Sequence, residues 1–116
     1  MGTVTIFHNP RCSKSRSSLA ILNEQGLETE IRLYLENPPN AKELTSILAM
    51  LGISARELLR KGEPDYKALN LADPGVSDTE IIQAMTEYPK LIERPIVIKD
   101  GKATIGRPPE LILELI

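Results

Sequence analysis

The amino-acid sequence predicts an α/β fold: a four-stranded mixed sheet with a helical insertion between its second strand and a C-terminal hairpin. Three observations support this prediction. Short β-branched runs lie near both ends of the chain, apolar residues at helical spacing fill the middle, and an Asp-Gly turn marks the hairpin. At 116 residues the chain is expected to form a single domain, 1–116, with the insertion at about 40–90.

The composition is that of an ordinary soluble globular protein, with 41% hydrophobic and 26% charged residues. The formal net charge of -2 gives no electrostatic argument for binding nucleic acid or an anionic membrane. No apolar stretch approaches the length of a membrane span, and the N-terminus lacks the pattern of a signal peptide. A single cysteine cannot form an internal disulfide, so the expected location is the cytoplasm, where thiols stay reduced.

The first third of the chain alternates between strand and helix patterns. Thr3–Phe7 alternates polar and apolar side chains, which predicts a half-buried strand. Apolar residues then return at helical spacing and predict a helix from about Ser13 to Gln25, with Gly26 as its left-handed terminator. A second strand is predicted where apolar residues alternate again, at Ile31, Leu33 and Leu35.

Three helices are predicted in the insertion, because a capping residue is followed three positions later by glutamate at three places. These capping pairs are Asn40 with Glu43, Ser54 with Glu57, and Ser77 with Glu80. The first and third helices are expected to bury one apolar face each. The inward residues are Leu44, Ile47, Leu48 and Leu51 in the first helix and Ile81, Ile82, Met85 and Tyr88 in the third, while the short second helix carries Leu58, Leu59 and Arg60.

The C-terminal part predicts a β-hairpin followed by a last helix. Asp100-Gly101 is a strong two-residue turn signal, and such a turn pairs Lys99 with Lys102. Extending this register places Arg94 opposite Arg107. The last helix is predicted from Pro108, Pro109 and Glu110 in its first turn and from Leu111, Ile112 and Leu115 facing inward.

The predicted pairing of Arg94 with Arg107 indicates an anion site. Directly opposite residues have Cβ atoms roughly 4.5–5.5 Å apart, where like charges are destabilising. Each arginine precedes a proline, which biases its backbone towards extended geometry. Two facing guanidinium groups are best explained by an oxyanion between them, because arginine binds oxyanions with paired hydrogen bonds.

Cys12, the only cysteine, lies between the first predicted strand and the first predicted helix. A thiol at such a junction faces the unpaired amides and the positive dipole end of the helix, and Arg11, Lys14 and Arg16 lie nearby in sequence. These features favour the thiolate, which is the reactive form of cysteine, and the same amides attract an anion. The segment therefore predicts both a nucleophile and a negatively charged substrate. With one histidine and one cysteine, no zinc-type metal site is expected in the chain.

The segment His8–Arg16 resembles the active-site loop of the glutaredoxin-coupled arsenate reductases, a family with a thioredoxin-like fold. Four further matching segments follow in the same order along the chain: Tyr34–Pro39, Glu57–Arg60, Glu93–Val97 and Gly106–Pro108. The resemblance covers essentially the whole chain and is strongest to a shorter, arsenate-reductase-like subgroup.

This resemblance implies the role of several residues. Cys12 would be the nucleophile, and Arg60, Arg94 and Arg107 would bind arsenate and the covalent intermediate. The peptide bond between Arg94 and Pro95 would be cis. Glutathione is implied as co-substrate and glutaredoxin as protein partner, with no bound cofactor.

Three supporting residues surround Cys12 in the sequence, and two of them, Ser15 and His8, keep two interpretations. Ser15 stands where a redox Cys-x-x-Cys pair has its second cysteine, so the chain cannot resolve an adduct by itself; its hydroxyl either serves the thiolate or lies on the helix surface. His8 either influences the thiol as a cation or hydrogen-bond partner, or is an ordinary loop histidine. Asn9 is expected to shape the turn rather than to touch the substrate.

Three functions follow from these expectations. The first is reduction of arsenate to arsenite through a covalent adduct on Cys12. The second is a glutathione-linked thiol-disulfide reductase with another substrate, retained because longer members of the family continue beyond the position of Ile116. The third is a redox-linked regulator that binds RNA polymerase; Ser15 removes the disulfide switch that such a regulator uses, and the three arginines favour small-anion chemistry. Neither nucleic acid nor a membrane is expected as a partner.

Overall fold

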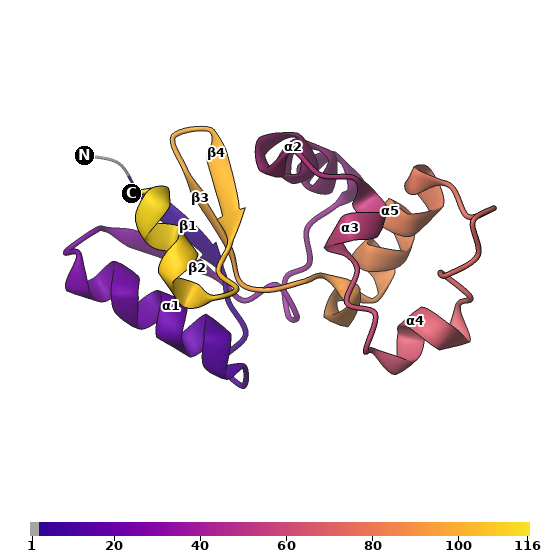
Figure 1. Ribbon diagram of the computed structural model, residues 1–116, viewed down its shortest axis with the longest axis horizontal. Coiled ribbons are helices and arrows are strands. Elements are labelled where there is room, and N and C mark those ends of the chain that lie inside the picture. The colour runs from indigo at the N-terminus through magenta and orange to yellow at the C-terminus, as the bar shows by residue number, and fades with distance from the viewer. Residues whose placement is uncertain (1–2) are drawn as a thin grey trace. The chain divides into compact units, whose positions relative to one another are not determined.

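The computed structural model describes residues 3–116, which divide into two compact units (Figure 1). The first unit contains the described residues up to Asn37 together with Arg94–Ile116. The second unit contains Pro38–Glu93 and corresponds to the predicted helical insertion. None of the described helices is both long and apolar enough to span a membrane.

The first unit is built on a four-stranded mixed sheet, as predicted. Strand β1 pairs in parallel with β2 and antiparallel with β3, and β3 pairs antiparallel with β4, which gives the spatial order β2-β1-β3-β4. The strands are β1 (Val4–Phe7), β2 (Thr29–Arg32), β3 (Ile96–Lys99) and β4 (Lys102–Ile105). The central position of β1 matters for function, because the chain leaves this buried strand directly into the loop that carries Cys12.

One face of the sheet is covered by α1 (Ser13–Glu24) and by the 3-10 helix η2 (Pro109–Glu114), as Figure 1 shows. Their contact with the sheet is a cluster of five side chains with 0% exposure: Val4, Ile6, Leu22, Val97 and Ile112. Because Ile6 pairs with Val97 across β1 and β3, these side chains project from the same face of the sheet. Burial of each such side chain stabilises the fold by about 1.5–3 kcal/mol, so this cluster fixes α1 on the sheet.

The predicted second strand is wrong in its position. Strand β2 ends at Arg32, and Leu33 and Leu35 lie in the loop and turn that follow, where the Glu36 N–H donates to the carbonyl of Leu33 at 3.0 Å. Ile31 is 48% and Leu33 is 38% exposed, so the alternation did not mark a buried face. The physical reason is that β2 is an edge strand with a single neighbour, whose pairing is decided by β1.

The C-terminal hairpin confirms the predicted turn and register. Asp100 and Gly101 both have positive φ, 52° and 76°, as a type I′ turn requires. Lys99 pairs with Lys102, and the ladder continues to Ile96 opposite Ile105. The last helix is a 3-10 helix in place of the expected α-helix, and it buries Ile112 while Leu111 and Leu115 are half-buried.

The second unit contains the three predicted helices, and the two capping boxes around Asn40 and Ser77 are present. The side chain of Asn40 accepts from the Glu43 amide at 2.8 Å, and Gly52 ends the helix in the left-handed region with φ 70°. The elements are α2 (Ala41–Leu51), α3 (Ala55–Leu58), α4 (Pro64–Ala68), α5 (Asp78–Glu87) and the 3-10 helix η1 (Pro89–Leu91).

Two expectations for the second unit are corrected, and one further helix is present. Helix α3 ends at Leu58, because Leu59 takes an extended conformation and forms a short bridge with Ile92, so Arg60 is not helical. Tyr88 ends α5 and is 40% exposed rather than inward. Helix α4 was not predicted, although Pro64 at its first position is a recognised start signal.

Gly106 follows β4 at a place where no larger residue fits. A Cβ atom built there would lie 2.5 Å from Ser18 Oγ on α1 and 3.0 Å from Pro95 Cγ. The absent side chain lets the end of the hairpin approach α1 closely, and it thereby sets the position of Arg107, the next residue.

We expect Gly106→Ala to lower the free energy of unfolding by about 1–3 kcal/mol, because the added methyl group forces backbone or side-chain shifts. The matched control is Gly62→Ala, since a Cβ at Gly62 meets no atom within 4 Å. Urea unfolding of both variants checks this. Equal stabilities would show that the contact of Gly106 with α1 is not tight.

Candidate active site

Cys12 is the N-cap of α1, at the junction where the sequence placed a nucleophile. Its backbone is extended (φ -95°, ψ 122°), its carbonyl accepts the first helical hydrogen bond from Arg16 N at 3.0 Å, and its side chain makes no capping hydrogen bond. The next three amides, those of Ser13–Ser15, have no partner within the helix, as at any helix start. They and the helix dipole attract an anion to the neighbourhood of the sulfur. Cys12 is buried, with 7% exposure, so water screens charges near it only weakly.

The loop before Cys12 is closed by local hydrogen bonds. The side chain of Asn9 accepts from Arg11 N at 3.0 Å, and the Asn9 carbonyl accepts from Cys12 N at 3.0 Å. Arg16 Nη1 donates to the carbonyl of Pro10 at 2.9 Å. Asn9 therefore shapes this turn with both its side chain and its backbone, and Arg16 holds the outer side of the loop.

His8 and Ser15 form a buried pair beneath the loop. His8 Nδ1 lies 2.6 Å from Ser15 Oγ, which also accepts from Asn9 N at 3.0 Å. Ser15 is 0% and His8 is 6% exposed. Burial lowers the pKa of His8, and the positive charge of Arg16 adds to this effect. His8 is thus a neutral hydrogen-bond partner of Ser15 near pH 7, and donation from Ser15 to Cys12 stays a prediction.

The fold of the first unit brings a cation, Arg107, to Cys12. Its Nη2 lies 4.0 Å from Cys12 Sγ, and its Nε donates to the carbonyl of Arg94 at 2.8 Å. Ninety-five positions separate Arg107 from Cys12 in the sequence. The Arg94 carbonyl aims the guanidinium by holding its Nε, which leaves Nη2 directed at the sulfur.

The predicted pairing of Arg94 with Arg107 as a regular cross-strand pair is wrong. The strand ladder ends at Ile96 and Ile105, and one further hydrogen bond, from Gly106 N to the Pro95 carbonyl at 2.9 Å, continues the register. Beyond that bond the contact is between the Arg107 side chain and the Arg94 backbone. Arg94 itself is largely buried at its guanidinium, where Nε and Nη1 are inaccessible to solvent. The two arginines are neighbours, and an anion site between their guanidinium groups stays a prediction.

The peptide bond between Arg94 and Pro95 is cis, as predicted, and that between Arg107 and Pro108 is also cis. The second cis bond was not expected from the sequence. Arg94 and Arg107 are therefore each followed by a cis proline.

Arg60, the third predicted arginine, belongs to the second unit. Its Nη1 lies 2.9 Å from Glu63 Oε2, and its Nε lies 3.6 Å from Glu93 Oε1. Its amide donates to the Leu91 carbonyl at 2.8 Å, which ties this segment to the end of the unit. Its side chain is 25% exposed, and its contribution to the site stays a prediction.

A pocket of about 370 Å³ lies beside the loop in the first unit. It is lined on one side by the loop residues and on the other by the turn after β2, with the members His8, Asn9, Pro10, Arg11, Leu33, Leu35 and Glu36. This pocket has no signature in the sequence, because the alternation of Leu33 and Leu35 predicts a strand there. Leu33 and Leu35 instead contribute apolar side chains to the wall of this pocket.

A model of the ArsC family matches residues 7–115 of this chain. The chain belongs to the ArsC family. Among its relatives are a protein of Escherichia coli K12 described as uncharacterized protein YfgD, 57% identical over 97% of this chain and 96% of the relative, and an arsenate reductase of Haemophilus influenzae, 47% identical over 98% and 99%. A solved structure of an arsenate reductase from Vibrio cholerae superposes with a TM-score of 0.97 at 47% identity, covering 99% of this chain and 98% of that one.

These matches confirm the resemblance and the thioredoxin-like fold inferred from the sequence. In this ArsC-family chain, the residues from 3 to 116 include no cluster of three His, Cys, Asp or Glu side chains that could hold a metal ion.

We expect the lowered pKa of His8 to make the fold less stable in mild acid. The unfolded chain takes up the proton near pH 6.5, whereas the folded chain does so only at lower pH, so the free energy of unfolding falls as pH decreases below about 6.5. His8→Asn removes this contribution, and its stability is expected to fall less than that of the wild type between pH 7.5 and pH 5.5. Denaturant unfolding at several pH values checks this; parallel curves would contradict it.

We expect Ser15→Ala to lower the free energy of unfolding by about 1–3 kcal/mol, because it deprives Asn9 N–H and His8 Nδ1 of a buried partner. Ser17→Ala is the matched control, since Ser17 is an exposed residue of the same helix. Its effect should stay within about 0.5 kcal/mol. If both substitutions had the same effect, the buried network would have no stabilising role.

Proposed function

We propose that this ArsC-family protein is an arsenate reductase that uses Cys12 as nucleophile, glutathione as co-substrate and glutaredoxin as partner. The observation that carries the proposal is the contact of Arg107 Nη2 with Cys12 Sγ, at 4.0 Å, beside the start of α1. Relatives and a solved structure with 47% identity bear the name arsenate reductase. The same arrangement of an anion site around a sulfur suits any reaction in which the nucleophile must approach a negatively charged substrate.

The first step joins the sulfur to arsenic. The Ser13–Ser15 amides and Arg107 hold the arsenate oxygens, so that electrostatic repulsion between the thiolate and the substrate is offset. Cys12 Sγ forms a bond to arsenic, and one arsenate oxygen leaves as water after gaining protons. Arsenic remains As(V) in this adduct, and no electrons have been transferred to it.

The second step transfers two electrons. The glutathione thiolate attacks Cys12 Sγ, the S–As bond breaks, and its electron pair stays on arsenic, which leaves as arsenite, As(III). Two thiols have then become the mixed disulfide of Cys12 with glutathione. Ser15 offers no second thiol to displace glutathione, so a separate dithiol protein such as glutaredoxin is needed to restore Cys12 by thiol-disulfide exchange.

The arginines act by charge and by position. Arg107 touches the sulfur and is the group best placed to bind the arsenate oxygens during attack. Arg94 positions Arg107 through its carbonyl, and its own guanidinium is proposed as a second ligand of the oxyanion. Arg60 is proposed as the third ligand, and its two glutamate partners would then compete with the substrate for its charge. The proposal places the protein in the cytoplasm, where glutathione is reduced.

A second candidate is a glutathione-linked reductase of an organic substrate. The pocket of about 370 Å³ beside the Cys12 loop favours it, because its walls from Leu33 and Leu35 suit an apolar group rather than an oxyanion. Mass spectrometry of Cys12 after incubation separates the candidates, since an arsenic adduct and a disulfide with an organic thiol differ in mass.

We expect arsenite formation in the presence of glutathione and glutaredoxin, and loss of this activity in Cys12→Ser. Arg107→Ala should lower turnover on the order of 100-fold, as removal of one oxyanion-stabilising donor does elsewhere. Lys102→Ala is the matched control, because Lys102 is an exposed cation on β4 outside the site. Arsenite release no faster than from the Cys12→Ser variant would refute the proposed activity.

A further inference from the structure

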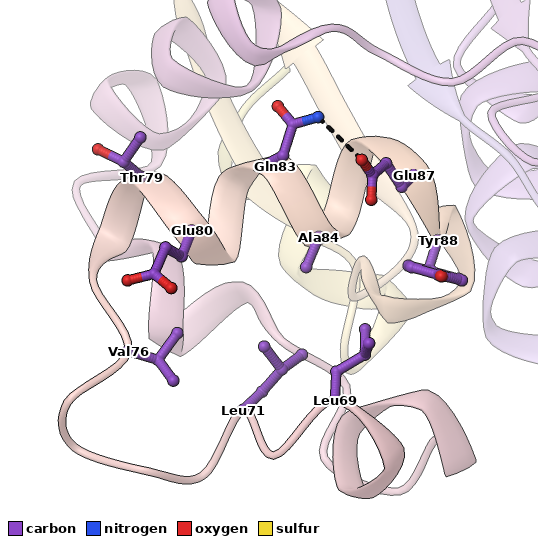
Figure 2. A pocket seen from close by; sticks show the side chains of 9 residues that line it. All are labelled: Leu69, Leu71, Val76, Thr79, Glu80, Gln83, Ala84, Glu87 and Tyr88. Atoms are coloured by element: carbon purple, nitrogen blue, oxygen red, sulfur yellow. Dashed lines mark hydrogen bonds between the residues drawn. The ribbon is translucent and has the colours of Figure 1, made fainter.

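The second unit contains a pocket that the proposed chemistry does not use. It is a groove of about 510 Å³ between α5 and residues 69–76, called here the α5 groove (Figure 2). Its lining residues are Leu69, Leu71, Val76, Thr79, Glu80, Gln83, Ala84, Glu87 and Tyr88. None of the proposed catalytic or arsenate-binding residues is among them, so this groove needs a separate explanation.

The wall opposite α5 is held in place by Arg56. Its Nη1 donates to the Leu71 carbonyl at 2.7 Å, and its Nη2 donates to the carbonyls of Asp73 and Val76 at 3.2 Å and 2.9 Å. Asp73 Oδ1 in turn accepts from Gly75 N at 2.8 Å. One guanidinium therefore fixes three points of the wall. A groove with such a wall is preformed, so binding would not carry the entropic cost of ordering this segment.

The floor of the groove is apolar, and its edge exposes large hydrophobic groups. Leu71 and Ala84 are buried, whereas Leu69 is 38% and Tyr88 is 40% exposed. In Figure 2 Tyr88 and Leu69 lie at the same end of the groove, with Ala84 and Leu71 facing each other further along. Exposed tyrosine and leucine around a preformed hollow are typical of protein interfaces rather than of an isolated surface.

The charge of the groove is negative. Glu80 and Glu87 line it, and no lysine, arginine or histidine is among its lining residues. One oxygen of Glu80, Oε1, also accepts from Ser77 N and Ser77 Oγ at 3.2 Å and 3.1 Å in the capping box. The two glutamates lie seven residues apart on α5, which is about two turns, so they share one face of the helix roughly 10.5 Å apart along its axis. Figure 2 shows Glu80 and Glu87 towards opposite ends of the groove, with the Gln83–Glu87 hydrogen bond of 3.1 Å between the turns. Arsenate and glutathione, which are anionic, are poorly matched to it.

We propose that the α5 groove binds an amphipathic helix of a partner protein, with two basic residues about two turns apart and apolar residues between them. The spacing follows from the glutamates, because side chains seven positions apart on a helix lie at the same axial separation as Glu80 and Glu87. The apolar residues of the partner would cover Leu69, Tyr88 and the floor. A small polyamine would match the two charges but would leave Leu69 and Tyr88 exposed, so a protein segment fits better.

The proposal is tested with a fluorescein-labelled, alanine-based helical peptide that carries two lysines seven positions apart and two leucines between them. Fluorescence anisotropy with the full chain is expected to show saturable binding. A matched peptide with glutamates in place of the lysines is expected not to bind. An absence of binding at about 1 mM peptide, or equal binding of the acidic peptide, would overturn the proposal.

Variants of the chain show where the peptide binds. Glu80→Gln combined with Glu87→Gln should weaken binding about three- to ten-fold, because two surface ion pairs are lost. Glutamine keeps the capping role of Glu80, so this double variant should fold normally. Tyr88→Ser should weaken binding further. Glu30→Gln, an exposed charge change on β2, is the control that should leave the affinity unchanged.

Two further results would also overturn the proposal. One is an affinity that Glu80→Gln with Glu87→Gln does not alter. The other is displacement of the peptide by spermidine at equal concentration, since charge alone would then account for binding. Arsenite formation should be unaffected by the groove variants, which separates this test from that of the proposed function.

Discussion

The contact of Arg107 with Cys12 is the interaction on which the proposed chemistry depends. It joins the end of the C-terminal hairpin to the start of α1, with Nη2 of the arginine 4.0 Å from the sulfur. The contact requires that the hairpin approach α1 closely, and Gly106 makes this possible because a Cβ there would meet Ser18 Oγ. The Arg94 carbonyl then sets the direction of the guanidinium. The position of Arg107 therefore depends on two backbone groups, those of Gly106 and Arg94, as well as on side chains.

The loop that carries Cys12 is supported from below by a buried polar pair. Ser15, the residue in the place of a second redox cysteine, accepts from the Asn9 amide and bonds to His8. A hydroxyl suits this position because it satisfies two groups that are shielded from water. Ser15 therefore has a structural role in holding the loop that precedes Cys12.

The candidate active site of the first unit and the α5 groove of the second differ in charge. The first gathers Cys12, the start of α1 and Arg107, which attract anions, whereas the α5 groove of the second is lined by glutamates and apolar groups. In each unit an arginine donates hydrogen bonds to backbone carbonyls: Arg107 to that of Arg94, and Arg56 to those of three wall residues. Guanidinium groups suit this purpose because their several donors lie in fixed directions.

The sequence alone determined the elements whose signals are local. The capping boxes at Asn40 and Ser77, the turn at Asp100-Gly101, and Cys12 at a helix start all depend on residues a few positions apart, and the structure has each of them. The roles of Arg60 and the identity of the substrate came from family resemblance rather than from patterning. Local signals failed at the end of an edge strand and at the end of a helix, as at Leu33 and Tyr88.

Only the tertiary structure decided which distant residues meet. Arg107 reaches Cys12 because β4 stops at Ile105 and Gly106 turns the chain onto α1, neither of which has a local signature. Extension of the hairpin register drew attention to Arg94 and Arg107; the ladder ends before they are reached, and their contact is from the Arg107 side chain to the Arg94 carbonyl. The α5 groove likewise depends on Arg56 bonding to carbonyls up to twenty positions away. Backbone carbonyls are the same in every residue, so no sequence pattern reveals which of them a side chain will find.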